Sequence, residues 1–268
     1  MPAPVEEKKV RGKKNKGKKK GKADPRKVEV LDACFALGHA CNYVSDWEDA
    51  RRYWKRAKEG YEEQLGPDSE KALKATYSLL VATGMSRGEK IDKLRVLVAR
   101  MVGALGEENV VTLDTLNQLG GELRENGEHE VARKVWERCL AGREKVLGED
   151  HRNTLMTVNN LGLLYKNLKD YEKALEYYER DLKGSEKMLG KTHPSTLGTV
   201  INIAIVYKML EDYGKAEELY QRALEGYEAQ LGKDHEDTKM CARNFRRCLN
   251  VSGNMKRLEE LKKEFPWL

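Results

Sequence analysis

The sequence predicts an all-α protein, a right-handed superhelical solenoid of antiparallel helix hairpins with about five and a half repeats. Two observations lead to this fold. The first is a dipeptide that recurs every 40 to 42 residues along most of the chain. The second is a pair of apolar faces inside each period, with the three- and four-residue spacing of amphipathic helices. A single hairpin cannot bury such a face, so successive hairpins must stack.

The recurring dipeptide is Leu-Gly, and its copies are separated by 40, 42, 42 and 42 residues. The five copies are Leu65-Gly66, Leu105-Gly106, Leu147-Gly148, Leu189-Gly190 and Leu231-Gly232. Aligned columns between them agree in residue type as well as in spacing. The repeat domain is therefore expected to span residues 23–268, with units starting near residues 23, 65, 105, 147, 189 and 231. The second unit is two residues short, and the sixth lacks most of its second half.

Each unit is expected to hold two helices. In the unit that begins at residue 147, apolar residues recur at helical spacing from Leu155 to Tyr165 and again from Tyr171 to Leu182. Residues 167–170 interrupt the pattern, which predicts a turn. Leu-Gly ends each second helix, because glycine readily takes the left-handed conformation of a helix C-cap. Glycine and alanine columns let the helices approach, aromatic columns fill the space beside them, and the first helices line a concave surface.

The Leu-Gly, Tyr, Ala, Tyr and Ala columns resemble tetratricopeptide repeats. The added pattern LGxDHPxT…NNLGxLY…YxxAExLYxRAL…ExxLG is similar to repeats of the kinesin light chain type, with residues 189–230 as the closest copy. The resemblance covers about residues 23–268 and implies a non-catalytic scaffold or adaptor that binds protein or peptide partners in its concave groove. Kinesin light chains carry a coiled coil before their repeats, whereas a lysine-rich segment precedes residue 23 here. We therefore do not expect binding to a kinesin heavy chain.

Amide side chains recur along the first helices, in a column that the resemblance places in the groove. The candidate groove residues are Asn117, Gln118, Asn159, Asn160, Asn202 and Asn244. An amide both donates and accepts hydrogen bonds, so a ladder of them can hold the backbone of an extended peptide. The alternative is that these residues only cap or space helices. Lys166 and Lys208 are expected near the same surface, which favours acidic or carboxylate-bearing peptides.

The net charge of +6 is unevenly distributed. Residues 1–27 hold 12 basic and 3 acidic side chains, which gives +9, whereas residues 28–268 hold 38 basic and 41 acidic side chains, which gives −3. Residues 1–22 have little apolar surface to bury, so we predict a disordered lysine-rich tail.

This tail supplies an alternative function, in which the protein associates with a polyanion (RNA, the ribosome or microtubules) and the repeats recruit a partner. Clustered lysines bind polyanions through counterion release. The candidate residues are Lys13, Lys14, Lys16, Lys18, Lys19 and Lys20. The tail has no interleaved aromatic residue to stack on bases, so only weak contact with nucleic acid or tubulin tails is expected. A solubilising role and a nuclear or nucleolar address are further alternatives.

Several classes of protein are not expected. No apolar run reaches the roughly 18 residues of a membrane span, so no membrane insertion is expected. No secretory signal is recognised, and the five cysteines are expected to be free thiols of a cytoplasmic protein. No Walker loop, GxGxxG, HExxH or GxSxG motif occurs, so we expect neither an enzyme nor a cofactor. The recurring residues His151, His193 and His235 are expected to start helices and not to bind a metal.

Two features depart from ordinary helix composition. Glycine recurs inside the second helices, where each copy costs about 1 kcal/mol relative to alanine. These glycines are Gly60, Gly142, Gly184 and Gly226, and we expect them to pack closely on the next hairpin. Asp181 stands in a column of otherwise small residues, as either a tolerated edge residue or a partner for a basic side chain such as Arg180.

Overall fold

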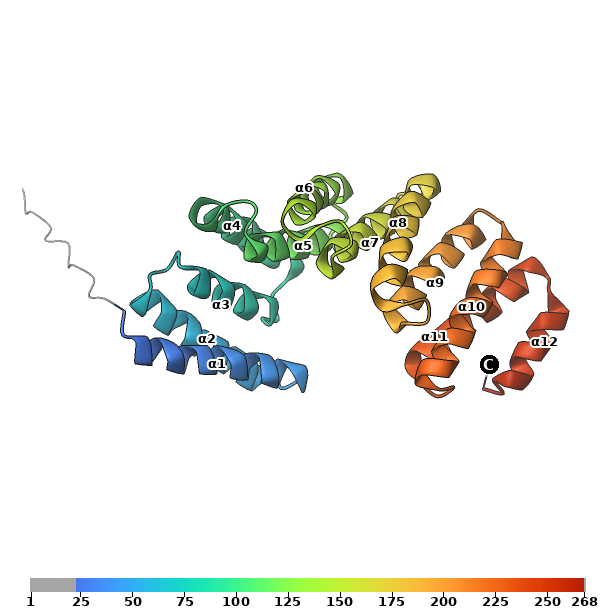
Figure 1. Ribbon diagram of the computed structural model, residues 1–268, viewed down its shortest axis with the longest axis horizontal. Coiled ribbons are helices and arrows are strands. Elements are labelled where there is room, and N and C mark those ends of the chain that lie inside the picture. The colour runs from blue at the N-terminus through green and yellow to red at the C-terminus, as the bar shows by residue number, and fades with distance from the viewer. Residues whose placement is uncertain (1–22, 268) are drawn as a thin grey trace, which may run out of the picture.

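The computed structural model describes residues 23–267, which form twelve helices and no strand (Figure 1). The helices are α1 (Pro25–Tyr43), α2 (Trp47–Gln64), α3 (Glu70–Val81), α4 (Arg87–Leu105), α5 (Val110–Glu125), α6 (His129–Leu147), α7 (Arg152–Asn167), α8 (Tyr171–Leu189), α9 (Pro194–Met209), α10 (Tyr213–Leu231), α11 (Glu236–Ser252) and α12 (Met255–Glu264). This confirms the predicted all-α solenoid. The lysine-rich tail of residues 1–22, with its candidate lysines, lies outside the described residues.

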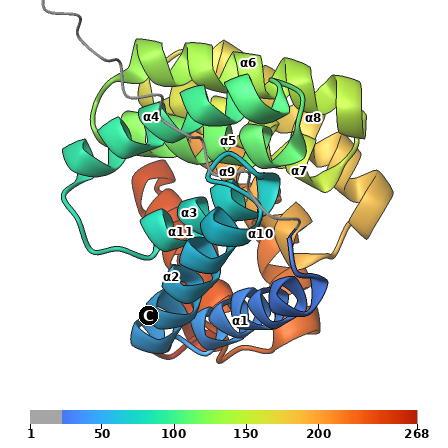
Figure 2. The ribbon, with the colours of Figure 1, turned by 90° about the vertical axis from the view of Figure 1, so that its left-hand side faces the viewer.

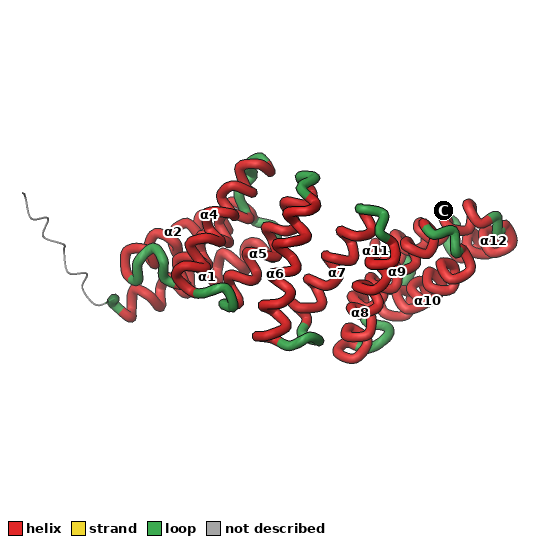
Figure 3. The backbone as a smooth tube through the Cα atoms, turned by 90° about the horizontal axis from the view of Figure 1, so that it is seen from above, coloured by secondary structure: helices red, strands yellow, loops and turns green. Residues whose placement is uncertain are grey.

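Consecutive helices pair as hairpins, and the hairpins follow one another along the long axis (Figure 3). Seen from the N-terminal end, they wind around that axis (Figure 2). Each helix packs mainly on the helices before and after it, and the first helices α3, α5, α7 and α9 also touch one another in order. The first helices therefore form a continuous inner row. The sixth hairpin is closed by α12, which has 10 residues where α10 has 19, so its second helix is shortened rather than largely missing.

The helices begin and end at the expected residues. His151, His193 and His235 are the N-caps of α7, α9 and α11, and their Nδ1 atoms accept backbone hydrogen bonds at 3.1, 3.1 and 3.2 Å. This confirms that the recurring histidines start helices. Gly148 and Gly190 follow α6 and α8 with φ of 92° and 89°, a left-handed region that other residues enter at a steric cost. Histidine N-caps thus begin the first helices of the last three units, whereas α1, α3 and α5 begin at Asp24, Ser69 and Asn109.

Small residues of the first helices receive large aromatic side chains of the second helices, as predicted. An added Cβ at Gly120 would lie 2.4 Å from Trp136 Nε1, and one at Gly162 would lie 2.8 Å from the Tyr178 ring. Trp136 and Tyr178 are almost completely buried. The same close approach occurs in the first hairpin, where an added Cβ at Gly38 would lie 2.5 Å from Trp54.

The glycines of the second helices also pack closely, but on a different neighbour from the one we expected. An added Cβ at Gly142 would lie 2.5 Å from Leu113, and one at Gly184 would lie 2.7 Å from Leu155. Both leucines belong to the first helix of the same hairpin and not to the next hairpin. The expectation was wrong because a fixed period shows that a residue is needed in every unit, without showing which neighbour it meets.

Four of the five cysteines are buried, and Cys41 is half-buried. Burial raises the pKa of the Cys241 thiol to about 12 and, with the charge of Glu217, that of Cys248 to about 11. These cysteines therefore act as small core residues that stay protonated. Among residues 23–267, no helix is long and apolar enough to cross a lipid bilayer.

Candidate functional site

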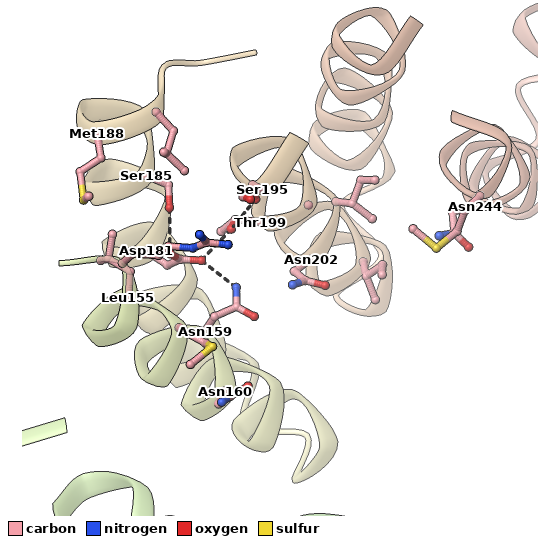
Figure 4. Close-up of a pocket in the computed structure, with 17 residues that line it drawn as sticks. Leu155, Asn159, Asn160, Asp181, Ser185, Met188, Ser195, Thr199, Asn202 and Asn244 are labelled. Carbon is pink, nitrogen blue, oxygen red and sulfur yellow. Dashed lines mark hydrogen bonds between the residues drawn. The ribbon is translucent and has the colours of Figure 1, made fainter. Parts of the chain in front are cut away.

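A cavity of about 490 Å³ lies where α7, α8, α9 and α11 meet (Figure 4). We call it the α7–α11 pocket. Its amide lining consists of Asn159, Asn160, Asn202 and Asn244. The structure therefore brings together four of the six predicted amide residues from three successive first helices. Its apolar lining includes Met156, Met188 and Met240, each a little under half exposed.

The amide side chains in the pocket differ in their hydrogen-bond partners within the protein. Asn160 Nδ2 donates a hydrogen bond to Asn117 Oδ1 at 3.1 Å, which ties α7 to α5. Asn202 and Asn244 make no side-chain hydrogen bond with any other residue in the described range 23–267. Two neighbouring units thus present amide groups whose donors and acceptors are available to a ligand.

The two predicted amides of the third unit do not line the pocket. Asn117 Oδ1 accepts the hydrogen bond from Asn160, and Gln118 Nε2 donates to Glu122 Oε1 at 3.0 Å. Asn117 therefore links two repeats, and Gln118 makes a contact within α5. The sequence column could not separate these roles, because they depend on the residues that face each amide in the folded chain.

The predicted lysines lie beyond the pocket, near the C-terminal ends of the first helices. Lys166 on α7 is half-buried, and its pKa is below the ordinary value because burial disfavours the charged form and the nearby Arg124 repels it. Arg124 and Lys208 occupy the same position on α5 and α9. We call Arg124, Lys166 and Lys208 the basic column. Arg124 adds one basic residue to the two lysines predicted from the sequence.

Asp181 is 4% exposed and lies on the wall of the pocket. Its carboxylate accepts hydrogen bonds from Asn159 Nδ2 at 2.7 Å, Thr199 Oγ1 at 2.6 Å and Ser185 Oγ at 3.1 Å (Figure 4). Arg180, the partner considered from sequence, instead donates to Glu144 at 2.5 Å. Of the two alternatives, the ion pair with Arg180 is not formed, because adjacent residues on a helix point in different directions. The Asn159 side chain is consequently turned towards Asp181 and holds this carboxylate in the wall of the pocket.

The family model of the tetratricopeptide repeat matches residues 111–187 and 195–250, the part of the chain that contains the pocket. The chain is a tetratricopeptide repeat protein. Proteins of this family bind protein or peptide partners and are generally non-enzymatic scaffolds. A comparison with curated protein sequences finds no match.

Solved structures support the same fold for this tetratricopeptide repeat protein. BtubC (BKLC) from P. vanneervenii matches with a TM-score of 0.68 at 21% identity, over 77% of this chain and 83% of that one. The kinesin light chain TPR-like repeats from P. anserina match with a TM-score of 0.60 at 19% identity, over 80% and 91% of the two chains. A Rap protein, solved in complex with competence and sporulation factor, matches with a TM-score of 0.60 at 14% identity, over 87% and 75%.

The pocket exists because the side chain at one position of the tetratricopeptide repeat differs in size between units. The position four residues before Leu-Gly holds Tyr61, Met101, Arg143, Ser185 and Tyr227 in successive units. Tyr61 reaches Asp32 at 2.6 Å, and Tyr227 reaches the carbonyl of Pro194 at 3.1 Å, so in these units the large side chain crosses to the first helix. Ser185 is too short to do so and leaves space between α7 and α9. A comparison of columns could have found this signal, because Ser185 is the one small residue among the five.

Arg143 fills the corresponding space at the preceding junction, between α5, α6 and α7. Its side chain is 1% exposed. Its guanidinium donates to the Asn153 carbonyl at 2.6 Å, to Thr157 Oγ1 at 2.7 Å and to Asp114 Oδ1 at 2.6 Å. The sequence does not distinguish this residue from others of its type, because an arginine in a helix is usually a solvated surface residue.

Proposed function

We propose that the protein is an adaptor that holds an extended peptide segment of a partner protein in the groove formed by α7, α9 and α11. The observation that carries the proposal is the row of amides on successive first helices, with Asn202 and Asn244 unbonded within the described chain. Amides on successive first helices can bind peptide groups a few residues apart along an extended ligand, because each amide offers both donors and an acceptor. Affinity from backbone contacts is independent of the ligand's side chains, so other features must set specificity.

The basic column gives the groove a preference for acidic segments. Lys166 is half-buried, and its positive charge is disfavoured by burial and by Arg124. A carboxylate of the partner at this place would relieve that repulsion and make a charge-assisted hydrogen bond. The proposed ligand is therefore a segment with acidic residues that face the ends of α7 and α9.

Kinesin light chain-like adaptors provide the analogy for this role, on the basis of fold alone. The fold similarity to BtubC and to the P. anserina repeats is at about one fifth identity, which supports the same architecture and leaves the partner open. We propose a cytoplasmic protein partner and no catalytic activity.

The proposal is tested by selecting phage-displayed random peptides on the full chain and measuring their affinity for two matched variants. The first combines Asn202→Ala with Asn244→Ala. The control combines Asn167→Ala with Asn250→Ala, two exposed residues outside the pocket on α7 and α11. We expect the first variant to bind at least about tenfold more weakly and the control to bind normally. Equal affinity for the first variant and the wild type, with unchanged helical circular dichroism, would contradict the proposal.

The lysine-rich tail supports a second, independent proposal, that residues 1–22 bind polyanions. The supporting observation is the charge of +9 on residues 1–27 against −3 on the remainder. The test compares the full chain with a chain lacking residues 1–22 for binding to single-stranded RNA, to microtubules and to the selected peptides, over a salt series. We expect tail deletion to remove salt-sensitive polyanion binding and to leave peptide binding unchanged. Equal RNA and microtubule binding by both forms would exclude this role.

A further inference from the structure

We propose that the α7–α11 pocket receives a cationic side chain of the bound segment, an arginine in first place, with Asp181 as its counter-charge. This inference rests on the proposed function for the identity of the ligand as a peptide. The pocket itself is tested separately below, with a small cation. Acidic residues of the segment would face the basic column, and one basic residue would enter the pocket.

The charge of Asp181 is the first argument. Its three hydrogen-bond donors, Asn159, Ser185 and Thr199, are all neutral. No Lys, Arg or His of residues 23–267 forms an ion pair with it within 4.0 Å, and Arg152, which lines the pocket, is exposed. A carboxylate offers about four lone-pair directions, so one remains for a ligand. A buried charge without an opposite charge is costly, and a ligand cation would offset that cost.

The repeat itself shows which group fits the space. At the preceding junction, Arg143 stands in the column of Ser185, and Thr157 stands in the column of Thr199. The Arg143 guanidinium binds Thr157 Oγ1 and the Asn153 carbonyl. In the pocket, the matching groups are Thr199 and Ser195, both part of the lining.

At the same place, Asp181 stands where the third unit has Cys139. A guanidinium supplied by a ligand would therefore meet the same hydroxyl and carbonyl acceptors as Arg143 does, with Asp181 as the carboxylate in place of Asp114, whose column holds Met156 in the fourth unit. The fourth unit has exchanged an internal arginine for a serine and has gained an acidic group beside the space.

The walls of the pocket are partly apolar, as the methylene groups of an arginine side chain require. Met156 and Met240 are 45% exposed and Met188 is 46% exposed, so an apolar surface stands open at the mouth. Gly198 lies between the two first-helix methionines in the same column, and an added Cβ there would meet only Tyr227 Oη, at 3.7 Å. Long cationic side chains bury their methylene stems against such surfaces. Guanidinium is more weakly hydrated than ammonium, which favours arginine over lysine.

The test uses the full chain with isotope-labelled methionine methyl groups and two probes of the same shape, butylguanidinium and butylurea. Only the first carries a charge. We expect butylguanidinium to shift the methyl signals of Met156, Met188 and Met240 saturably, at least about tenfold more tightly than butylurea. Met209 and Met255, outside the pocket, serve as internal references. Equal binding of the two probes would overturn the inference and assign an apolar pocket, and the absence of shifts at the three methionines would also overturn it.

Two variants distinguish the effect of the Asp181 charge from the effect of the open volume of the pocket. Asp181→Ala introduces the residue that this column carries at Ala57 and Ala223, and it should remove the preference for butylguanidinium over butylurea. Gly198→Leu fills the pocket from a helical position with open space and should abolish binding of both probes. Gly121→Leu is the matched control, because Gly121 is helical, an added Cβ there meets no atom within 4 Å, and it lies outside the lining. An unchanged probe preference in Asp181→Ala would contradict the role of this carboxylate.

The outcomes distinguish this inference from the proposed function. Peptides selected in the groove that bind Asp181→Ala and Gly198→Leu as tightly as wild type would support a groove without a cation pocket. Charge-selective binding of butylguanidinium, with no peptide sensitive to Asn202→Ala and Asn244→Ala, would support the pocket and overturn the peptide groove.

Discussion

The junction between α5, α6 and α7 and the junction between α7, α8 and α9 are built from the same repeat columns, yet one is filled and the other is hollow. In the first, Arg143 bridges to Asp114 and Thr157. In the second, Ser185 occupies the same column and leaves a cavity of about 490 Å³. The residues that pack every hairpin therefore stand at different positions of the repeat from the residue that leaves space for a ligand at one junction.

Removal of Arg143 is expected to have the largest effect on stability. Arg143→Ala leaves a cavity and removes the hydrogen bonds of the guanidinium to the Asn153 carbonyl, Thr157 and the partly exposed Asp114, so we expect a loss of about 2–5 kcal/mol. Ser185→Ala at the second junction removes one hydrogen bond to Asp181 and should cost about 1 kcal/mol. Urea unfolding of both variants measures the difference. Similar losses for the two variants would show that the filled junction is not the more strongly bonded one.

The glycines of the second helices should behave alike at both junctions. Gly142→Ala and Gly184→Ala each place a Cβ within 2.7 Å of a leucine, so we expect each to destabilise the protein by about 1–3 kcal/mol. Gly103→Ala, where the added Cβ meets no atom within 4 Å, should stabilise it by up to about 1 kcal/mol. Thermal unfolding of the three variants checks the signs. Stabilisation by Gly184→Ala would mean that Leu155 moves freely into the pocket.

The filled junction also predicts a response to alkaline pH. Burial raises the pKa of Tyr77 from 10.0 to about 12, with a further contribution from Asp114. A raised pKa in the folded state stabilises the protein at pH below 10 and loses that contribution as the pH rises through about 12. Tyr77→Phe should therefore flatten the fall in stability in this range by up to about 2 kcal/mol. Urea titrations at several pH values, together with ultraviolet detection of tyrosinate, measure it. An identical pH dependence in Tyr77→Phe would assign the fall to other tyrosines.

Surface ion pairs between hairpins should matter least. Arg180 pairs with Glu144 and Arg222 pairs with Glu186, each at 2.5 Å and about one third exposed. Such pairs are screened by water and salt, so each Arg→Ala change should cost less than about 1 kcal/mol and should cost about the same at the two positions. A larger loss for Arg180→Ala would indicate that the ion pair supports the wall that carries Asp181.

The fold was predictable because the residues that pack every unit recur with the period. Leu-Gly, the aromatic column and the histidine N-caps all have the structural roles that their spacing indicates. The pocket was less predictable, because it arises from departures from the period at Ser185 and Gly198. The partners of Asp181 lie 22 and 18 residues away along the chain, on α7 and α9, so only the packing of three helices brings them together.

Methionine methyl signals can show directly whether the groove of α7, α9 and α11 binds a peptide segment. A peptide selected on the full chain would be titrated into protein with isotope-labelled methionine methyl groups. We expect saturable shifts of Met156, Met188 and Met240, which line the α7–α11 pocket, and little change at Met255 on α12. Shifts confined to Met255 or to methionines remote from the pocket and from the basic column would place the binding surface elsewhere and contradict a peptide groove on α7, α9 and α11.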